Sequence, residues 1–211
     1  MNKIIQGDSL ELMKDMADGS VDLVLTDPPY NAKNIGPNER EYSEGTMQLP
    51  EKEYRKFCKD WIKEALRVGK RVVFTPGIAN MCFYPQPKWV ICWHKPAAVS
   101  FNRMGGFNAW ELVFIYGDTK GVRLGQDYLK VNTLNFTKGV EAEHPCPKPP
   151  ELIGKLISIF SKEGELVFDP FNGSGTTTVM ARNLKRSYMG IDKNKSYCEM
   201  AEKRLAATPL L

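Results

Sequence analysis

The segment that most constrains this chain is Asp27-Pro28-Pro29-Tyr30, which directly follows the apolar run Val21 to Thr26. The run predicts a short strand, and the two prolines end it, because proline fixes φ and lacks the N–H that a sheet ladder requires. A carboxylate, backbone carbonyls and an aromatic ring are therefore presented at one point. This set suits a planar base with an amino group, since the ring can stack on the base while the carboxylate and a carbonyl accept its two N–H bonds.

Strand and helix signals alternate along the rest of the chain. A short strand at Ile4-Ile5 precedes a helix near residues 10–16, for which Asp8 or Ser9 is the expected N-cap. The clearest helix covers residues 51–68, where apolar residues recur at i, i+3, i+4 and i+7. Further strands are predicted at 71–75, 89–93, 111–116, 165–168 and 187–191, and further helices at 148–160, 176–184 and 195–205. The alternation predicts an α/β fold whose sheet carries helices on both faces.

Length and composition set broad limits on function. The 211 residues are expected to form one domain, with a loop at 31–50 that is polar, flexible and close to the Asp-Pro-Pro-Tyr motif. A net charge of +4 permits a nucleic-acid partner without demanding one. Five dispersed cysteines and two histidines predict neither a disulfide framework nor a metal site. We find no run of roughly 20 apolar residues and no signal peptide, so an intracellular protein is expected.

A second motif lies between Leu166 and Thr177, where a predicted strand ends at Asp169, turns through Gly173 and Gly175 and enters a helix. Glycine lets a ligand approach the backbone, and a helix N-terminus offers free N–H groups. The pattern is not the usual dinucleotide fingerprint, and alone it would be weak. Asp192 strengthens it, because this acid ends the next predicted strand, where a ribose-binding acid is expected.

Together, these motifs resemble those of the amino-methylating DNA methyltransferases, which act on N6 of adenine or N4 of cytosine. Thr-Asp-Pro-Pro-Tyr resembles their catalytic motif, Phe168 to Thr177 resembles their S-adenosylmethionine motif, and His144 to Glu151 resembles their His-Pro…Lys-Pro segment. The order of the three motifs is similar to that of the β class. The resemblance implies a Rossmann-like methyltransferase fold with a mostly parallel, seven-stranded sheet and circularly permuted motifs.

The resemblance also implies site residues. Catalysis is assigned to Asp27, Pro28, Pro29 and Tyr30. The permuted order makes the first strand the neighbour of the strand that carries Asp192, so that Asp8 becomes a cofactor contact as an alternative to a helix cap. The residues expected to bind S-adenosylmethionine are Asp8, Lys148, Phe168, Asp169, Pro170, Phe171, Gly173, Ser174, Gly175, Thr176 and Asp192.

Substrate and partners follow from the same resemblance. Asp as the first motif residue is typical of adenine enzymes, whereas N4-cytosine enzymes usually carry Ser, so methylation of adenine N6 in DNA is expected. N4-cytosine methylation and the same reaction on RNA remain alternatives, and a non-catalytic DNA-binding subunit is disfavoured by the complete motifs. The target-recognition insert, at about 117–143, is short. A homodimer partner could add contacts, and the expected location is the cytoplasm of a bacterial, archaeal or phage-infected cell.

Overall fold

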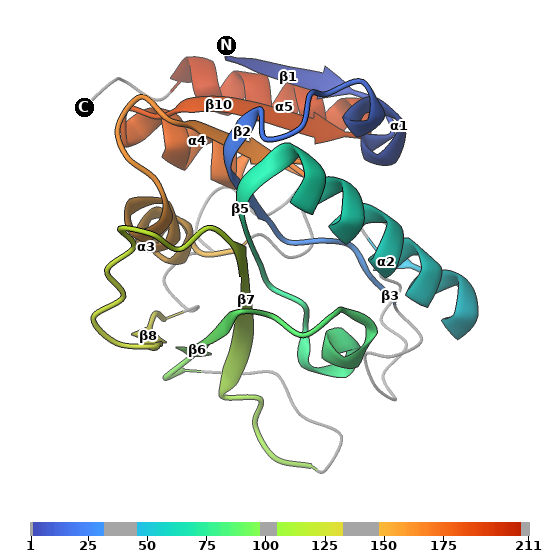
Figure 1. Ribbon diagram of the computed structural model, residues 1–211, viewed down its shortest axis with the longest axis vertical. Helices are drawn as coiled ribbons and strands as arrows, with labels where there is room; N and C mark the ends of the chain where they lie inside the picture. Colours follow the sequence, from blue (N-terminus) through green and yellow to red (C-terminus); the bar gives the residue numbers. More distant parts are fainter. Residues whose placement is uncertain (1, 32–45, 98–104, 133–147, 208–211) are drawn as a thin grey trace.

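The computed structural model describes residues 2–31, 46–97, 105–132 and 148–207, and its framework is one sheet of eight strands (Figure 1). In spatial order the strands are β1 (Lys3–Gln6), β10 (Ser187–Asp192), β9 (Leu166–Asp169), β2 (Val21–Thr26), β5 (Gly69–Phe74), β7 (Trp110–Gly117), β6 (Trp89–His94) and β8 (Tyr128–Lys130). All neighbouring pairs are parallel except those of β7, which runs antiparallel to both β5 and β6. The expected α/β architecture is confirmed.

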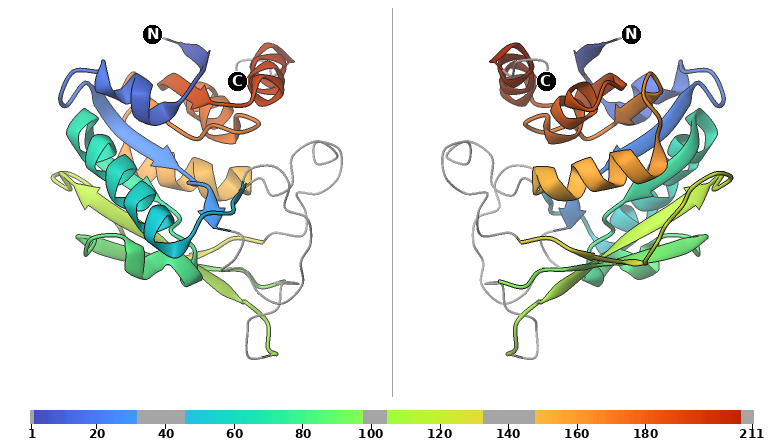
Figure 2. Two further views of the ribbon diagram at one scale, coloured as in Figure 1. Left: turned by 90° about the vertical axis from the view of Figure 1, so that its right-hand side faces the viewer. Right: turned by 90° about the vertical axis from the view of Figure 1, so that its left-hand side faces the viewer.

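Helices cover both faces of this sheet (Figure 2). The helices are α1 (Ser9–Lys14), α2 (Glu51–Val68), α3 (Pro150–Phe160), α4 (Thr176–Asn183) and α5 (Lys195–Ala207). Helices α1 and α2 contribute to one buried apolar cluster, and α3 and α4 to the cluster on the opposite face. The predicted periodicity of α2 is confirmed, because its buried side chains include Tyr54, Cys58, Trp61, Ile62 and Ala65.

The strand count differs from the expected seven. The additional strand is β8, which pairs in parallel with β6 along Cys92 to His94 and lies at the edge of the sheet. It comes from the segment 117–143, for which the sequence predicted no element. Three residues of alternating exposure carry too little periodicity to be recognised alone, so the pairing with β6 defines the strand.

The connections that follow the two central strands β2 and β9 lead to opposite sides of the sheet. From β2 the chain crosses through α2 to β5, and from β9 it crosses through α4 to β10 on the other side of the sheet. The carboxyl ends of the neighbouring strands β2 and β9 therefore flank a topological switch point, which is where open α/β sheets bind ligands. Strand β1 pairs in parallel with β10, with Gln6 opposite Asp192, which confirms the neighbour that the permuted motif order predicted.

Two local features near this edge had no counterpart in the predictions. A 3-10 helix covers Ile78–Phe83 after β5, and a small parallel sheet joins β3 (Tyr30–Asn31) to β4 (Thr46–Met47). The Asn31 side chain adds two hydrogen bonds to the Leu49 backbone, at 2.9 and 3.2 Å. Residues 32–45 of the predicted loop lie outside the described residues. No helix in the described ranges is long and apolar enough to cross a membrane.

Candidate active site

Asp27 lies directly after β2, and both of its carboxylate oxygens are engaged. Oδ1 accepts hydrogen bonds from the hydroxyls of Tyr30 and Thr75, the latter just beyond the end of β5. Oδ2 lies 2.8 Å from the Lys148 ammonium, which also donates to the Tyr30 hydroxyl at 3.3 Å. Residues 27, 75 and 148 are far apart in the sequence and meet because their segments reach the same edge of the sheet.

These contacts leave limited acceptor capacity for a substrate. A carboxylate has about four acceptor sites, about two on each oxygen. Two hydroxyls fill those of Oδ1, whereas Lys148 takes one on Oδ2. The Tyr54 hydroxyl of α2 donates to the Pro29 carbonyl at 3.0 Å, whereas no donor contacts the Pro28 carbonyl within the described part of the chain. One Asp27 site and the Pro28 carbonyl therefore remain to accept N–H bonds.

Tyr30 is held at both ends of its side chain. Its ring lies against Gly77, where an added Cβ would come within 2.8 Å of Cε1, and its hydroxyl donates to Asp27. Burial, reinforced by the Asp27 carboxylate, raises the pKa of Tyr30 well above its ordinary value, so the hydroxyl stays a donor. The sequence motif indicated the ring but not this anchoring hydrogen bond.

The glycine turn after β9 is held by Asp192 and by α5. Asp192 accepts hydrogen bonds from the backbone N–H groups of Gly173 and Asn194, both at 2.8 Å. Gly175 adopts a left-handed conformation, with φ of 87°, and a Cβ there would meet Ala201 of α5 at 2.7 Å. From the same helix, Arg204 donates to the Ser174 carbonyl at 2.6 Å. The predicted alignment of the glycine turn with Asp192 is confirmed. Nothing in the sequence indicated that Arg204 contacts this turn.

Asp169 connects the two motifs at the switch point. Its Oδ1 accepts a hydrogen bond from the Thr26 hydroxyl at 2.6 Å and another from the Phe171 N–H at 3.0 Å. Burial raises the pKa of this carboxyl to about 6, although hydrogen bonds from Thr26, Thr177 and Phe171 oppose the rise. Since Thr26 precedes Asp27, this hydrogen bond joins the glycine turn to the Asp-Pro-Pro-Tyr motif.

The other predicted cofactor residues differ in position. Phe168 is fully buried in the core, and its contact with the cofactor stays a prediction. Phe171 packs against Phe57 and Trp61, and the Pro170 carbonyl accepts a hydrogen bond from the Ser9 hydroxyl. Ser174 and Thr176 are both buried, at the turn and at the first residue of α4 respectively.

Asp8 caps a helix, which is the alternative role that the sequence predicted for it. It is the N-cap of α1, accepting from the N–H groups of Leu10 at 2.8 Å and Glu11 at 3.3 Å, and it forms an ion pair with Lys193 at 2.8 Å. Burial alone would raise the pKa of Asp8, but the Lys193 and backbone hydrogen bonds bring it below its ordinary value. Its contact with the cofactor stays a prediction.

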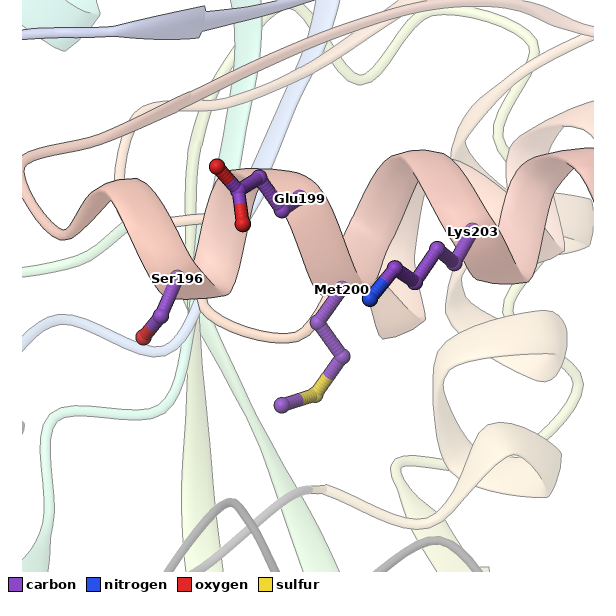
Figure 3. Close-up of a pocket in the computed structure, with 4 residues that line it drawn as sticks. All are labelled: Ser196, Glu199, Met200 and Lys203. Atoms are coloured by element: carbon purple, nitrogen blue, oxygen red, sulfur yellow. The ribbon is translucent and has the colours of Figure 1, made fainter.

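Lys148 lies beside the Asp-Pro-Pro-Tyr motif, and its contact with the cofactor stays a prediction. The sequence assigned it to the cofactor, whereas the structure brings it to Asp27 and to Glu111 of β7, with 3.9 Å between Nζ and Oε2. Residues 133–147, which include the predicted His144 and Pro145, lie outside the described residues. A separate hollow on the exposed side of α5 contains none of the predicted residues and is lined by Ser196, Glu199, Met200 and Lys203 (Figure 3).

Comparisons with known proteins define the class as that of DNA methylases. The family described as DNA methylase matches residues 107–203. The chain is 30% identical to Type II methyltransferase M.HinfI of Haemophilus influenzae, over 97% of this chain and 68% of that protein. It is 28% identical to Type II methyltransferase M2.DpnII of Streptococcus pneumoniae, over 97% of this chain and 89% of that protein.

Solved structures share the fold. The chain superimposes on the cytosine-N4-specific PvuII DNA methyltransferase with a TM-score of 0.73, at 20% identity over 97% of this chain and 86% of that one. The complex of M1.HpyAVI with S-adenosylmethionine gives a TM-score of 0.69, at 23% identity over 97% and 99% of the two chains. The chain therefore belongs to the amino-methylating N6/N4 family of DNA methyltransferases, whose cofactor is S-adenosylmethionine.

Proposed function

We propose that this protein transfers a methyl group from S-adenosylmethionine to N6 of adenine in DNA, with Asp27 and Pro28 as the groups that hold the target amine. The observation that carries the proposal is the acceptor pattern at the end of β2. An amino group has two N–H bonds to satisfy, and the two acceptors that remain are one site on Asp27 Oδ2 and the Pro28 carbonyl.

The residues around the glycine turn fit the cofactor. The ribose hydroxyls of S-adenosylmethionine require acceptors. Asp192 is the last residue of β10, and Asp8 follows the neighbouring strand β1. The turn from Gly173 to Thr176 allows close approach of the backbone, and we assign the cofactor's binding to these residues. When bound, the cofactor supplies an electrophilic methyl group on its sulfonium.

The protein's part in the reaction is to orient a poor nucleophile and to hold its proton. The lone pair of an aromatic amine is delocalised into the ring, and hydrogen bonds to Asp27 and Pro28 favour the pyramidal nitrogen of the transition state. Asp27 then holds the proton that leaves the nitrogen. In duplex DNA the base must first leave the stack, and Tyr30 is the proposed stacking partner, with about 1–3 kcal/mol expected for such a contact.

The choice of adenine over cytosine rests on the sequence. Asp27 occupies the motif position where the resemblance associates Asp with adenine and Ser with cytosine. The two amines require the same acceptors, so the site geometry is compatible with both. Type II names among the relatives support a restriction–modification setting for the reaction. A homodimer stays a prediction.

Nucleoside analysis tests the proposal. The purified protein is incubated with S-adenosylmethionine carrying a labelled methyl group and with DNA or RNA of mixed sequence, and the digested nucleosides are separated by mass spectrometry. We expect label in N6-methyldeoxyadenosine. Label confined to N4-methyldeoxycytidine or to RNA would establish one of the alternatives, and no label under conditions where the cofactor binds would exclude methyl transfer.

A pair of variants connects the result to the site. Asp27→Ala should abolish transfer while leaving cofactor affinity within about twofold, because Asp27 contacts no residue of the glycine turn directly. Asp15→Ala, at an exposed carboxylate after α1, should retain wild-type activity. Equal activity of the two variants would contradict the assignment of Asp27.

A further inference from the structure

Four charged side chains of alternating sign form a continuous line that ends at the catalytic carboxylate. We call the group of Lys95, Glu111, Lys148 and Asp27 the ion chain. Lys95 Nζ lies 2.6 Å from Glu111 Oε1, Glu111 Oε2 lies 3.9 Å from Lys148 Nζ, and Lys148 Nζ lies 2.8 Å from Asp27 Oδ2. The ion chain is neutral as a whole, with two cations and two anions.

The ion chain opens to solvent mainly at Asp27. The side chain of Asp27 is 27% exposed, whereas those of Glu111, Lys148 and Lys95 are 19%, 8% and 6% exposed. Burial alone would raise the pKa of Glu111, yet Lys148 and Lys95 hold it below its ordinary value, so Glu111 is an anion between two ammonium groups. Asp27 is thus the most exposed of the four side chains.

Stability alone does not explain such an arrangement. Burying charges away from water is costly, and apolar residues of similar volume often replace buried ion pairs without loss of stability. Apolar core residues lie next to the ion chain in the sequence, since Trp93 of β6 comes two residues before Lys95 and Val113 of β7 two residues after Glu111. A function that requires a fixed cation at Asp27 accounts for the cost.

We propose that Glu111 is a positioning residue, which together with Lys95 holds the Lys148 ammonium against Oδ2 of Asp27 and so fixes the acceptor site that the target amine uses. Tyr30 and Thr75 fix Oδ1 through their hydroxyls, and Lys148 is the contact that restrains Oδ2. Without this contact the carboxylate plane can turn about its Cβ–Cγ bond and lose its alignment with the amine.

The charges make a specific prediction about double variants. Glu111→Gln removes one of the two anions of the ion chain and leaves both of its ammonium groups. The buried group then carries a surplus positive charge, and Lys148 has lost the carboxylate that fixes it on the side away from Asp27, so its ammonium can leave its position for solvent. Adding Lys95→Met removes the surplus charge, so that Lys148 and Asp27 again form a neutral pair. The second change should therefore repair the first, which a purely structural role of Glu111 in packing would not produce.

The experiment measures methyl transfer to DNA by the wild type, Glu111→Gln, Lys95→Met and the double variant. Glu64→Gln is the matched control, because Glu64 is also 19% exposed and forms an ion pair with Arg67 at 2.8 Å on α2, away from the site. Thermal unfolding and cofactor affinity are measured for each protein, so that loss of folding or of cofactor binding is recognised.

We expect Glu111→Gln to lower kcat by roughly 10- to 100-fold, since displacing a catalytic group by about 1 Å costs about 10²-fold. The KM for S-adenosylmethionine should change less than about twofold. The double variant should recover to within about fivefold of the wild-type kcat. Glu64→Gln should behave as the wild type.

Two results would overturn the inference. Wild-type kcat in folded Glu111→Gln, or a double variant slower than Glu111→Gln, would remove the positioning role while the proposed function stands. The inference rests on Asp27 holding the amine. If the wild type binds cofactor but methylates neither base in DNA, the proposed function itself fails and the positioning role fails with it.

Discussion

Replacing Asp169 by asparagine should stabilise the protein at neutral pH. The carboxyl is 3% exposed and its pKa is raised by burial from 3.8 to about 6. A raised pKa means that the folded state binds the proton more tightly than the unfolded chain does. Asp169 therefore costs increasing free energy as the pH rises from about 4 to about 6, and the full cost persists above that window.

The magnitude follows from the shift. About two pKa units at about 1.4 kcal/mol each give a cost near 3 kcal/mol at pH 7, and about 1 kcal/mol at pH 4.5. Asparagine does not titrate, and its Oδ1 can accept the same hydrogen bonds from Thr26 and Phe171. The free energy of unfolding of Asp169→Asn, minus that of the wild type, should thus rise by about 2 kcal/mol between pH 4.5 and pH 7.5.

Urea unfolding at several pH values measures this difference. Asp22→Asn is the control of opposite sign. Burial alone would raise the pKa of Asp22, but hydrogen bonds from Lys70 and Leu166 hold it below its ordinary value. That variant should be less stable than the wild type by an amount that is constant over the same window. A difference for Asp169→Asn that stays flat, or falls with rising pH, would refute the assigned cause.

Three further predictions concern the residues that support the site. Tyr54→Phe and Tyr116→Phe each remove one hydroxyl donor to a proline carbonyl, at 3.0 and 2.7 Å respectively. Each variant should lose about 1 kcal/mol of unfolding free energy, but only Tyr54→Phe should lower kcat. Gly77→Ala and Gly19→Ala, at φ of 68° and 63°, should each cost about 1–2 kcal/mol. Only Gly77→Ala, whose added Cβ would meet the Tyr30 ring at 2.8 Å, should also lower kcat, and equal kcat values would contradict this. Arg204→Met should raise the Kd for S-adenosylmethionine about tenfold through loss of its charged hydrogen bond to the glycine turn, and an unchanged Kd in titration calorimetry would exclude that role.

Much of the fold was predictable because its signals are local. The apolar periodicity of residues 51–68 predicted α2 with the bounds that the structure shows. The run before Asp27 predicted β2, and the Gly-rich turn with Asp192 at its proper spacing predicted the connection from β9 through α4 to β10. The motif order, which rests on the resemblance to the family, predicted that β1 lies beside β10. The parallel pairing of the two strands confirms this prediction.

Other features required the assembled sheet. Strand β8 has too few residues to give a periodic signal and is defined by its pairing with β6. Glu111 and Lys95 are ordinary charged residues at the ends of two apolar strands, and nothing in the sequence sets them apart. Lys148 was identified from its motif, but its partner was not, because a motif describes neighbours in the chain rather than in space.

The sequence by itself determined the chemistry that this protein presents. A carboxylate, two prolines and a tyrosine in succession, and an acid before a glycine turn, follow from residues a few positions apart. Tertiary structure decided how that chemistry is arranged, since the residues that restrain Asp27 come from the ends of β5, β6 and β7 and from the segment before α3. Those ends meet only when the strands pair in register at one edge of the sheet. Burial at that edge also requires that each charge be paired with an opposite one.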